Sequence, residues 1–214
     1  MSGRLAAWLV LVGVQIAANY ASRASGGKPP KNAIYHWDLA IGGLVQYAII
    51  LGVVLAIVSP APRRLLALRR PDSWGRALGL AAAVLVGIYV ITAVLDPILH
   101  PGREQGLTPS GFDSHRAAAF VVNFVVIAVV APVVEELTFR GAGFGLFERY
   151  GRSVAIVAVG LLFGLAHGLV EALPILVVFG IGLAWLRSRT RSVYPGMLLH
   201  AAFNALALAV AIAT

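Results

Sequence analysis

Residues 117–147 read AAAFVVNFVVIAVVAPVVEELTFRGAGFGLF, an apolar stretch in which the only charged side chains are Glu135, Glu136 and Arg140. Roughly 20 apolar residues cross the hydrocarbon of a bilayer as a helix, so this stretch is long enough to span it. We expect spans at residues 5–21, 39–59, 77–95, 117–147, 154–170, 173–186 and 194–213. The sequence therefore predicts an all-α, polytopic transmembrane helix bundle of about seven spans, within a range of six to eight.

The composition supports lipid as the solvent of this chain. Of 214 residues, 59% are hydrophobic and 12% are charged, whereas roughly a quarter of a soluble domain is charged. A soluble domain of this size has too large a surface to hide so much apolar area. The length suits one compact unit, so we expect residues 1–214 to form a single membrane domain.

The basic residues gather in short linkers between the apolar stretches. Five arginines lie within residues 60–76, and other arginines follow the spans that end near residues 147 and 186. The alternate linkers hold fewer basic residues: Arg23, Lys28 and Lys31 in one, Arg103 and Arg116 in another. Because cytoplasmic loops carry the excess of Lys and Arg, we expect a cytoplasmic N-terminus. The net charge of +8 thus indicates a membrane surface and no nucleic-acid partner.

The first apolar stretch allows two interpretations. Arg4, an apolar run and the small residues near Ala21 also fit a signal peptide. We favour an uncleaved helix, because AANYAS is a loose cleavage site. The chain has no cysteine, which excludes disulfides, cysteine-ligated zinc and a thiol nucleophile.

Polar side chains at membrane depth are costly and call for a reason. They occur in three of the expected spans: Glu135, Glu136 and Arg140 in one, His167 in the next, His200 and Asn204 in the last. Counted at 1.5 Å per helical residue from the arginine-rich side, these groups lie at similar depth. We therefore expect Glu135, His167, His200 and Asn204 to converge on one buried site.

The residue types in this set suit the hydrolysis of an amide. A carboxylate takes a proton from water, and imidazoles orient that water or bind a metal. Glu135, His167 and His200 are also a ligand set that catalytic zinc uses. The Asn204 amide could donate to the oxyanion that forms during attack on a carbonyl. Glu136 and Arg140, four residues apart on a helix, are expected to form a supporting ion pair.

Each group also has a structural interpretation when it is taken alone. A paired Glu136 and Arg140 is one way in which a helix bundle tolerates charge. Asn204 alone would be an interhelical hydrogen bond, and His167 a helix-contact histidine. Gly160, Gly164 and Gly168 are interpreted as positions where a neighbouring helix approaches closely.

Three motifs in order resemble one family. EELTFR at 135–140 matches the EExxxR motif, FGLAH, which runs from Phe163 to His167, the FxxxH motif, and HAAFN at 200–204 the HxxxN motif. The chain therefore resembles the CAAX prenyl protease and bacteriocin-processing family of intramembrane proteases, also called the Abi family. The resemblance covers residues 120–209, and we assign the catalytic core to residues 117–213. The first half of the chain carries no matching signature.

The resemblance implies an all-helical intramembrane endopeptidase whose site opens to the cytoplasm. It implies that Glu135 activates water with help from His167, supported by Glu136 and Arg140, while His200 and Asn204 stabilise the oxyanion or associate with a metal. A divalent metal such as zinc, held by Glu135, His167 and His200, stays open beside a metal-free glutamate mechanism. The Ala-, Gly- and Arg-rich composition looks bacterial, so we expect a multi-pass protein of a bacterial cytoplasmic membrane.

The substrate class is left broad at this stage. We expect a peptide or a membrane-protein segment, with a lipid-modified target as a further alternative and the oligomeric state open. Two other functions compete: a non-catalytic peptide-binding or immunity scaffold, and an ion- or proton-coupled transporter. Paired, repeated halves would indicate a transporter, and the sequence has no such symmetry. It has neither the HExxH nor the GxSxG motif of other protease types.

Overall fold

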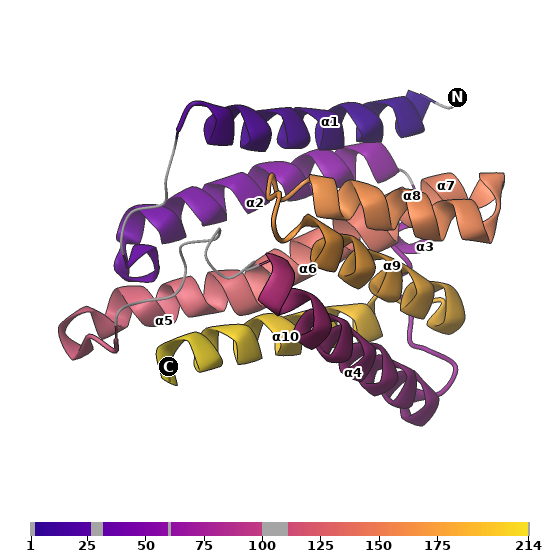
Figure 1. Ribbon diagram of the computed structural model, residues 1–214. Helices are drawn as coiled ribbons and strands as arrows, with labels where there is room; N and C mark the ends of the chain where they lie inside the picture. Colours follow the sequence, from indigo (N-terminus) through magenta and orange to yellow (C-terminus); the bar gives the residue numbers. More distant parts are fainter. Residues whose placement is uncertain (1–2, 27–31, 60, 100–110, 214) are drawn as a thin grey trace.

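The computed structural model describes residues 3–26, 32–59, 61–99 and 111–213, and all regular structure within these ranges is helical (Figure 1). Lys28, Lys31 and Arg103, which entered the charge argument, lie outside the described residues. Six helical stretches of the described chain are long and apolar enough to cross a membrane. A seventh apolar helix is shorter. The expected all-α bundle of six to eight spans is confirmed, and the protein is a multi-pass membrane protein.

Most spans are single helices with bounds near those expected. They are α1 (Gly3–Ala24), α2 (Trp37–Val58), α4 (Trp74–Leu99), α9 (Leu173–Thr190) and α10 (Tyr194–Ala213), and the shorter helix is α8 (Arg152–Leu165). Two short elements, η1 (Ala33–Tyr35) and α3 (Pro62–Leu65), lie in the linkers. The long apolar runs dictate helices because only internal hydrogen bonds satisfy the backbone in lipid.

The span quoted at the outset is one continuous helical rod with two wide turns. It consists of η3 (Ser114–Arg116), α5 (Ala117–Val125), the π-helix η4 (Val126–Val130), α6 (Ala131–Glu136), the π-helix η5 (Leu137–Gly143), α7 (Phe144–Phe147) and η6 (Glu148–Tyr150). Its 37 residues exceed what the hydrocarbon requires. The two π segments flank the helix that carries both glutamates, and π segments frequently occur at functional sites.

The expected fifth and sixth spans differ from the structure in length. We expected residues 154–170, but α8 ends at Leu165, and its 14 residues rise only about 21 Å. Gly168 follows in a turn with a φ of +66°, a conformation that glycine adopts readily. His167 therefore lies in a turn and not on the helix, which corrects our assignment. The sixth span extends past residue 186 to Thr190, because α9 continues through its arginines.

Glycines let α8 and α9 approach each other closely. A Cβ added to Gly160 would lie 2.5 Å from the Ile181 side chain, and one added to Gly180 would lie 2.6 Å from the Gly160 carbonyl oxygen. A Cβ added to Gly164 would lie 2.6 Å from the Val177 side chain, so the packing role expected for Gly160 and Gly164 is confirmed. Gly168, however, lies against Asn19 of α1. Small residues at such crossings let helices pack where no hydrophobic effect drives them together.

Helix α1 is packed into the bundle. Its Leu5, Trp8 and Val12 are buried, and the Trp8 indole donates a hydrogen bond to the Thr138 carbonyl oxygen at 2.9 Å. That oxygen belongs to the π segment η5 of the long rod. The contact is close enough that a Cβ on Gly143 would lie 2.5 Å from the Trp8 ring. Whether this segment is retained or cleaved as a signal peptide stays a prediction.

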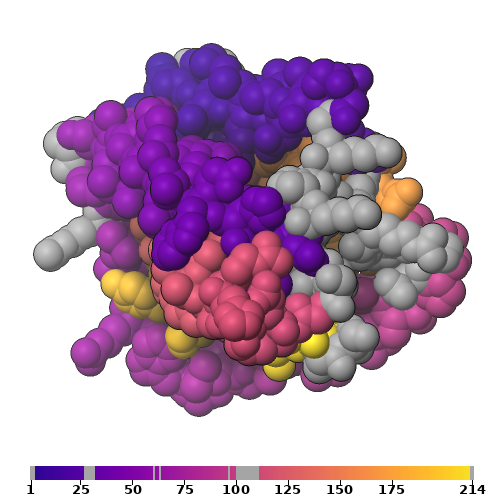
Figure 2. Space-filling view, turned by 90° about the vertical axis from the view of Figure 1, so that its left-hand side faces the viewer, coloured from indigo at the N-terminus to yellow at the C-terminus, as the bar shows by residue number. Residues whose placement is uncertain are grey.

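The arginine-rich linkers gather at one end of the bundle. In Figure 1 the end of α2, the junction of α7 with α8 and the end of α9 all lie to the right, with the N-terminus. Figure 2 shows the opposite end, where α1, α2 and the start of α5 lie one below the other. The arginine-rich linkers thus share one end, as the charge pattern predicted, while Arg23 and Arg116 lie at the other; the leaflet that the arginine-rich end faces stays a prediction.

Candidate active site

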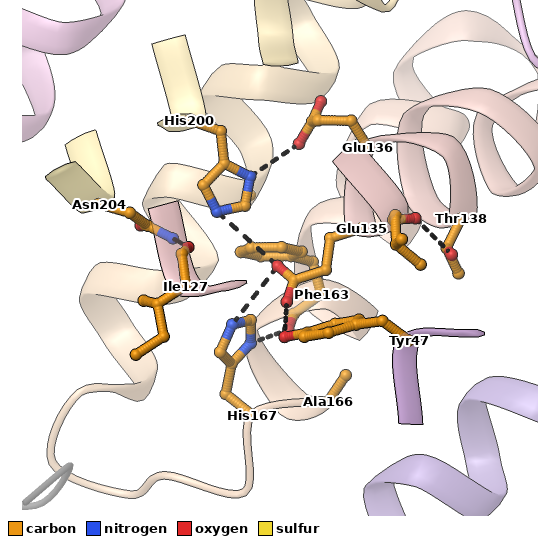
Figure 3. Close-up of polar contacts among 12 residues, drawn as sticks. Tyr47, Ile127, Glu135, Glu136, Thr138, Phe163, Ala166, His167, His200 and Asn204 are labelled. Atoms are coloured by element: carbon orange, nitrogen blue, oxygen red, sulfur yellow. Dashed lines mark hydrogen bonds and ion pairs between the residues drawn. The ribbon is translucent and has the colours of Figure 1, made fainter. Parts of the chain in front are cut away.

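Glu135 is the residue on which the other polar groups converge (Figure 3). It lies in the last turn of α6, and its side chain is 14% exposed. The hydroxyl of Tyr47, from α2, donates a hydrogen bond to Glu135 Oε1 at 3.0 Å. The other oxygen, Oε2, faces two imidazoles, with His200 Nε2 at 3.7 Å and His167 Nε2 at 4.0 Å. Residues from four parts of the chain thus meet at one carboxylate.

Glu136 and Arg140 form a fully buried ion pair behind this carboxylate. Arg140 Nη1 donates to Glu136 Oε1 at 2.9 Å, and neither side chain is exposed. Arg140 Nη2 donates to the Gly180 carbonyl oxygen of α9 at 3.0 Å. The guanidinium lies over the Phe163 ring, 4.2 Å from its centroid. The pair is therefore anchored to two neighbouring helices, as buried charges require.

His200 connects the ion pair to Glu135. Its Nδ1 lies 3.2 Å from Glu136 Oε1, and its other ring nitrogen faces Glu135. The rings of Phe179 and Phe163 pack edge-on against the imidazole, with centroids 5.0 and 5.7 Å away. The side chain is 3% exposed. Packing and a carboxylate together fix the direction of this ring.

His167 is held by the turn that follows α8. Its Nδ1 lies 2.8 Å from the Phe163 carbonyl oxygen, one helical turn back. The turn itself is tied to α1, because the Asn19 amide donates to the Ala166 carbonyl oxygen at 2.6 Å and the Tyr20 hydroxyl to that of Leu169 at 3.3 Å. Non-helical backbone at membrane depth is tolerated only where protein or water satisfies it. Helix α1 provides the hydrogen-bond donors for two of the carbonyl oxygens in this turn.

The two histidine contacts determine where the ring protons lie. A carbonyl oxygen only accepts, so His167 Nδ1 carries the hydrogen that it donates to Phe163. Glu136 Oε1 accepts from Arg140, and His200 Nδ1 faces the same oxygen as a donor. In the neutral rings, both Nε2 atoms then present lone pairs toward the Glu135 carboxylate. Three acceptors converge, and they require a donor between them.

A water molecule meets that requirement. The separations of 3.7 and 4.0 Å are too long for direct hydrogen bonds. Polar atoms at such distances are commonly bridged by water. Water has two O–H donors, and this site offers it three acceptors within one small region. The geometry therefore suits a water held against Glu135.

Asn204 lies one turn beyond His200 on α10 and contacts the long rod. Its Nδ2 donates to the Ile127 carbonyl oxygen at 2.9 Å, and Ile127 belongs to the π segment η4. The structure thus places Asn204 beside the site, bonded to a backbone carbonyl instead of to Glu135. An amide nitrogen carries two hydrogens, so the second remains to donate elsewhere.

The Glu, His, His donor set is one that zinc uses, but its spacing does not match a zinc site. Bonds of about 2 Å in a tetrahedron separate ligand atoms by roughly 3.3 Å, less than the 3.7 and 4.0 Å measured here. Within the described ranges, no group of three or more His, Cys, Asp or Glu is placed to hold a metal ion. The side chains as placed do not fit a metal centre.

Sequence reasoning missed two contributors from the first half of the chain. Tyr47 contacts Glu135 directly, and Asn19 holds the turn that carries His167. Both are polar residues within apolar spans, the signal that led to Glu135 and Asn204. Their helices carry no recognised motif, so nothing in the sequence connected them with the other site residues.

Comparisons with known proteins point to one family. The model of the family described as type II CAAX prenyl endopeptidase Rce1-like matches residues 117–206, a range that contains all three motifs. The chain is also 24% identical over 185 residues to the Bacillus subtilis (strain 168) protein named "Putative membrane peptidase YdiL", covering 84% of this chain and 75% of that protein. The resemblance to the CAAX protease family is confirmed. No solved structure matches.

The site extends beyond the segment that the family model matches. The match begins at residue 117, whereas Asn19 and Tyr47 lie in α1 and α2. The relationship to a membrane peptidase supports a peptidase activity. The roles of the individual site residues are proposals that substitutions can test.

Replacing Tyr47 by Phe tests the contact with the Glu135 carboxylate. The change removes one hydroxyl and leaves the ring, so the fold should persist. A hydrogen bond to a charged group contributes about 1.5–3 kcal/mol, so we expect a loss of roughly tenfold to a hundredfold in peptidase rate. Tyr150→Phe is the matched control, because Tyr150 is 48% exposed in η6 and, among the contacts described, touches none of the site residues. Equal rates in wild type and Tyr47→Phe would contradict the assignment.

Replacing Asn19 by Ala should loosen the turn that carries His167. The chain has no cysteine, so a single His167→Cys substitution gives a unique label site there. With Asn19→Ala added, we expect faster labelling by a maleimide, because the Ala166 carbonyl oxygen loses its donor. Gln15→Ala, one turn earlier on α1, is the control and should leave the rate unchanged. The inferred role of Asn19 is wrong if both double variants label alike.

Proposed function

We propose that this protein is an intramembrane endopeptidase that hydrolyses a peptide bond of a peptide or membrane protein with a water activated by Glu135. The observation that carries the proposal is the convergence of Glu135 Oε2 with two imidazole Nε2 atoms. Their lone pairs point to one place and call for a donor. The family resemblance indicates the reaction class, and the three acceptors indicate where the reacting water would bind.

Glu135 acts as the general base in this proposal. One water hydrogen passes to Glu135 Oε2 while the water oxygen bonds to the substrate carbonyl carbon. The Tyr47 hydroxyl on Oε1 keeps the carboxylate oriented toward the water. His167 accepts the second water hydrogen bond through Nε2, which directs a lone pair of the water oxygen at the carbon. Holding the reactants this way removes much of the entropic cost of the reaction.

The tetrahedral intermediate then needs donors for its oxyanion. The Asn204 amide retains one hydrogen beyond its bond to Ile127 and can donate it. His200 Nε2 faces the same region, and in this proposal it makes the second contact with the oxyanion when that nitrogen carries a hydrogen. When the C–N bond breaks, the proton held by Glu135 passes to the leaving amine. The products are a carboxylic acid and an amine, which together contain all the atoms of the amide and the water, and Glu135 is returned to its starting form.

The buried ion pair holds this arrangement in place. Glu136 contacts both Arg140 and His200, and Arg140 reaches α9 through the Gly180 carbonyl oxygen. In addition, a Cβ on Gly196 would lie 2.6 Å from Glu136 Oε2, so α10 packs directly on this carboxylate. These contacts set the distance between α6 and α10. That distance in turn sets the separation of Glu135 from His200.

The proposed site lies within the membrane, with Glu135 13 residues, about 20 Å, from Glu148 at the arginine-rich end. From Tyr194 at the start of α10, His200 lies six residues along, about 9 Å. If that end faces the cytoplasm, as the positive-inside rule indicates, then the N-terminus is cytoplasmic and substrate reaches the site from that side. The lipid bilayer and a peptide or membrane-protein substrate are the partners in this proposal.

Replacing Glu135 by Gln should abolish proteolysis without unfolding the protein. The amide is isosteric but accepts no proton from water, so we expect a rate loss of at least a hundredfold. Membrane proteomes of cells expressing wild type or the variant are compared by sequencing new protein N-termini. Termini present only with wild type would identify both the activity and the cleavage site.

Two further variants serve as controls for this comparison. Glu148→Gln makes the same chemical change at an exposed position of η6 and should leave the termini unchanged. Glu136→Ala should instead lower the yield of folded protein, because it leaves Arg140 buried without its partner. If wild type and Glu135→Gln give identical termini at equal expression, a peptide-binding scaffold or a transporter becomes the better account.

Chelation tests the metal-free form of the mechanism. Because the donor spacing does not match zinc, we expect purified protein to keep its rate after dialysis against 1,10-phenanthroline. Metal content per chain, measured by inductively coupled plasma mass spectrometry, should be well below stoichiometric. A lost rate that zinc restores would show instead that Glu135, His167 and His200 close around an ion.

A further inference from the structure

A cavity of about 520 Å³ lies at the arginine-rich end, separate from Glu135. Its lining comes from the linker before α4 and from the first turns of α4 and α10. Two arginines, Arg69 and Arg70, line it together with Trp74, Tyr194 and Leu198. The cavity therefore combines positive charge with an apolar and aromatic wall.

Hydrogen bonds between two linkers hold the backbone next to the residues that line this cavity. Arg69 Nε donates to the Arg191 carbonyl oxygen at 2.8 Å, and the Val193 amide donates to the Ala67 carbonyl oxygen at 3.3 Å. Ala67 has a φ of +51°, a conformation uncommon for alanine, so the linker is held in a defined shape. The Arg69 guanidinium is consequently oriented by the protein.

Positive charge accumulates around this cavity. Besides Arg69 and Arg70, Arg187 of α9 lies within electrostatic range of Arg69 and is only 7% exposed. Arg187 also interacts electrostatically with the Glu148 carboxylate, and its Nε has no hydrogen-bond partner within the part of the chain that the structure describes. The like charges of Arg69 and Arg187 repel each other. An anion in the cavity would relieve that repulsion.

The cavity lies where headgroups meet hydrocarbon. Trp74 begins α4 and Tyr194 begins α10, and both are spanning helices. Trp and Tyr collect at such membrane interfaces. Trp74 is 40% and Leu198 52% exposed, so apolar surface on both helices faces outward. A ligand here would have its anionic group beside the arginines and its apolar part beside α10.

We propose that this cavity binds the headgroup of an anionic phospholipid. The lipid phosphate contacts Arg69 and Arg70, because guanidinium groups match phosphate oxygens with paired hydrogen bonds. An acyl chain runs along Leu198 and Met197 toward the hydrocarbon. This binding site goes beyond the peptidase activity and does not depend on it.

The proposal has a consequence for the site as well. Met197 lines the cavity and precedes His200 by three residues on the same helix. A lipid bound against the first turn of α10 thus contacts the helix whose Gly196 packs on Glu136. Anionic lipid would stabilise the helix that carries His200 and Asn204.

Native mass spectrometry of the purified full chain tests the proposal directly. Phosphatidylglycerol and phosphatidylcholine of equal chain length are added separately to wild type, to Arg70→Glu and to Arg152→Glu. Arg152 begins α8 at the same end of the bundle but does not line the cavity. Both Arg→Glu variants have the same net charge, so they differ only in the position of the change. We expect phosphatidylglycerol to bind wild type and Arg152→Glu, and binding to fall about tenfold in Arg70→Glu.

Each other outcome overturns the proposal. Equal losses in both variants would mean a general attraction to the basic end and no defined site. Undiminished binding in Arg70→Glu would mean that the cavity is not involved. Displacement of phosphatidylglycerol by millimolar inorganic phosphate, or preferential binding of a peptide with a free carboxylate, would assign the arginines to another ligand. Arg70→Gln, a milder change at this exposed residue, repeats the measurement if Arg70→Glu elutes as aggregate.

Discussion

The ion pair between Glu136 and Arg140 is the constraint on which the rest of the structure depends. Two opposite charges with no exposed surface are tolerated only when every neighbour helps to satisfy them. Arg140 binds the α9 backbone and lies over Phe163 of α8, while Glu136 binds His200 of α10. Four helices are therefore placed relative to one another by polar contacts, in a solvent where apolar packing gives little direction. Glu135 inherits its position from that arrangement.

Much of the fold could be predicted from apolar length and charge placement. Runs of apolar residues gave the spans, because only helices satisfy the backbone in lipid, and the arginines gave the end at which the linkers gather. Helix ends were less predictable. The apolar character of α8 continues past Leu165, but the positive φ of Gly168 breaks the helix there. The π segments also have no signature in hydropathy, since they change the winding of the rod and leave its composition unaltered.

The candidate site was predictable in its titratable residues and not in its uncharged ones. Glu135, His167 and His200 stood out because charge and imidazole are costly in an apolar span. Tyr47 and Asn19 carry smaller polar groups, and their partners are far away in the sequence. Only the three-dimensional packing of α1 and α2 reveals that these side chains complete the site. The family comparison matches the segment with the motifs, whereas the surroundings of that segment come from the first half of the chain.

The short α8 has a consequence for the bilayer around this protein. At about 21 Å, α8 covers only part of a hydrocarbon layer of about 30 Å. Lipids beside a segment that is too short adjust by thinning the membrane locally. The turn with His167 would then lie close to the headgroups of the far leaflet, and water would have a shorter path to the carboxylate. Membranes of different lipid composition differ in thickness. The thickness of the surrounding bilayer would therefore affect how readily water reaches Glu135.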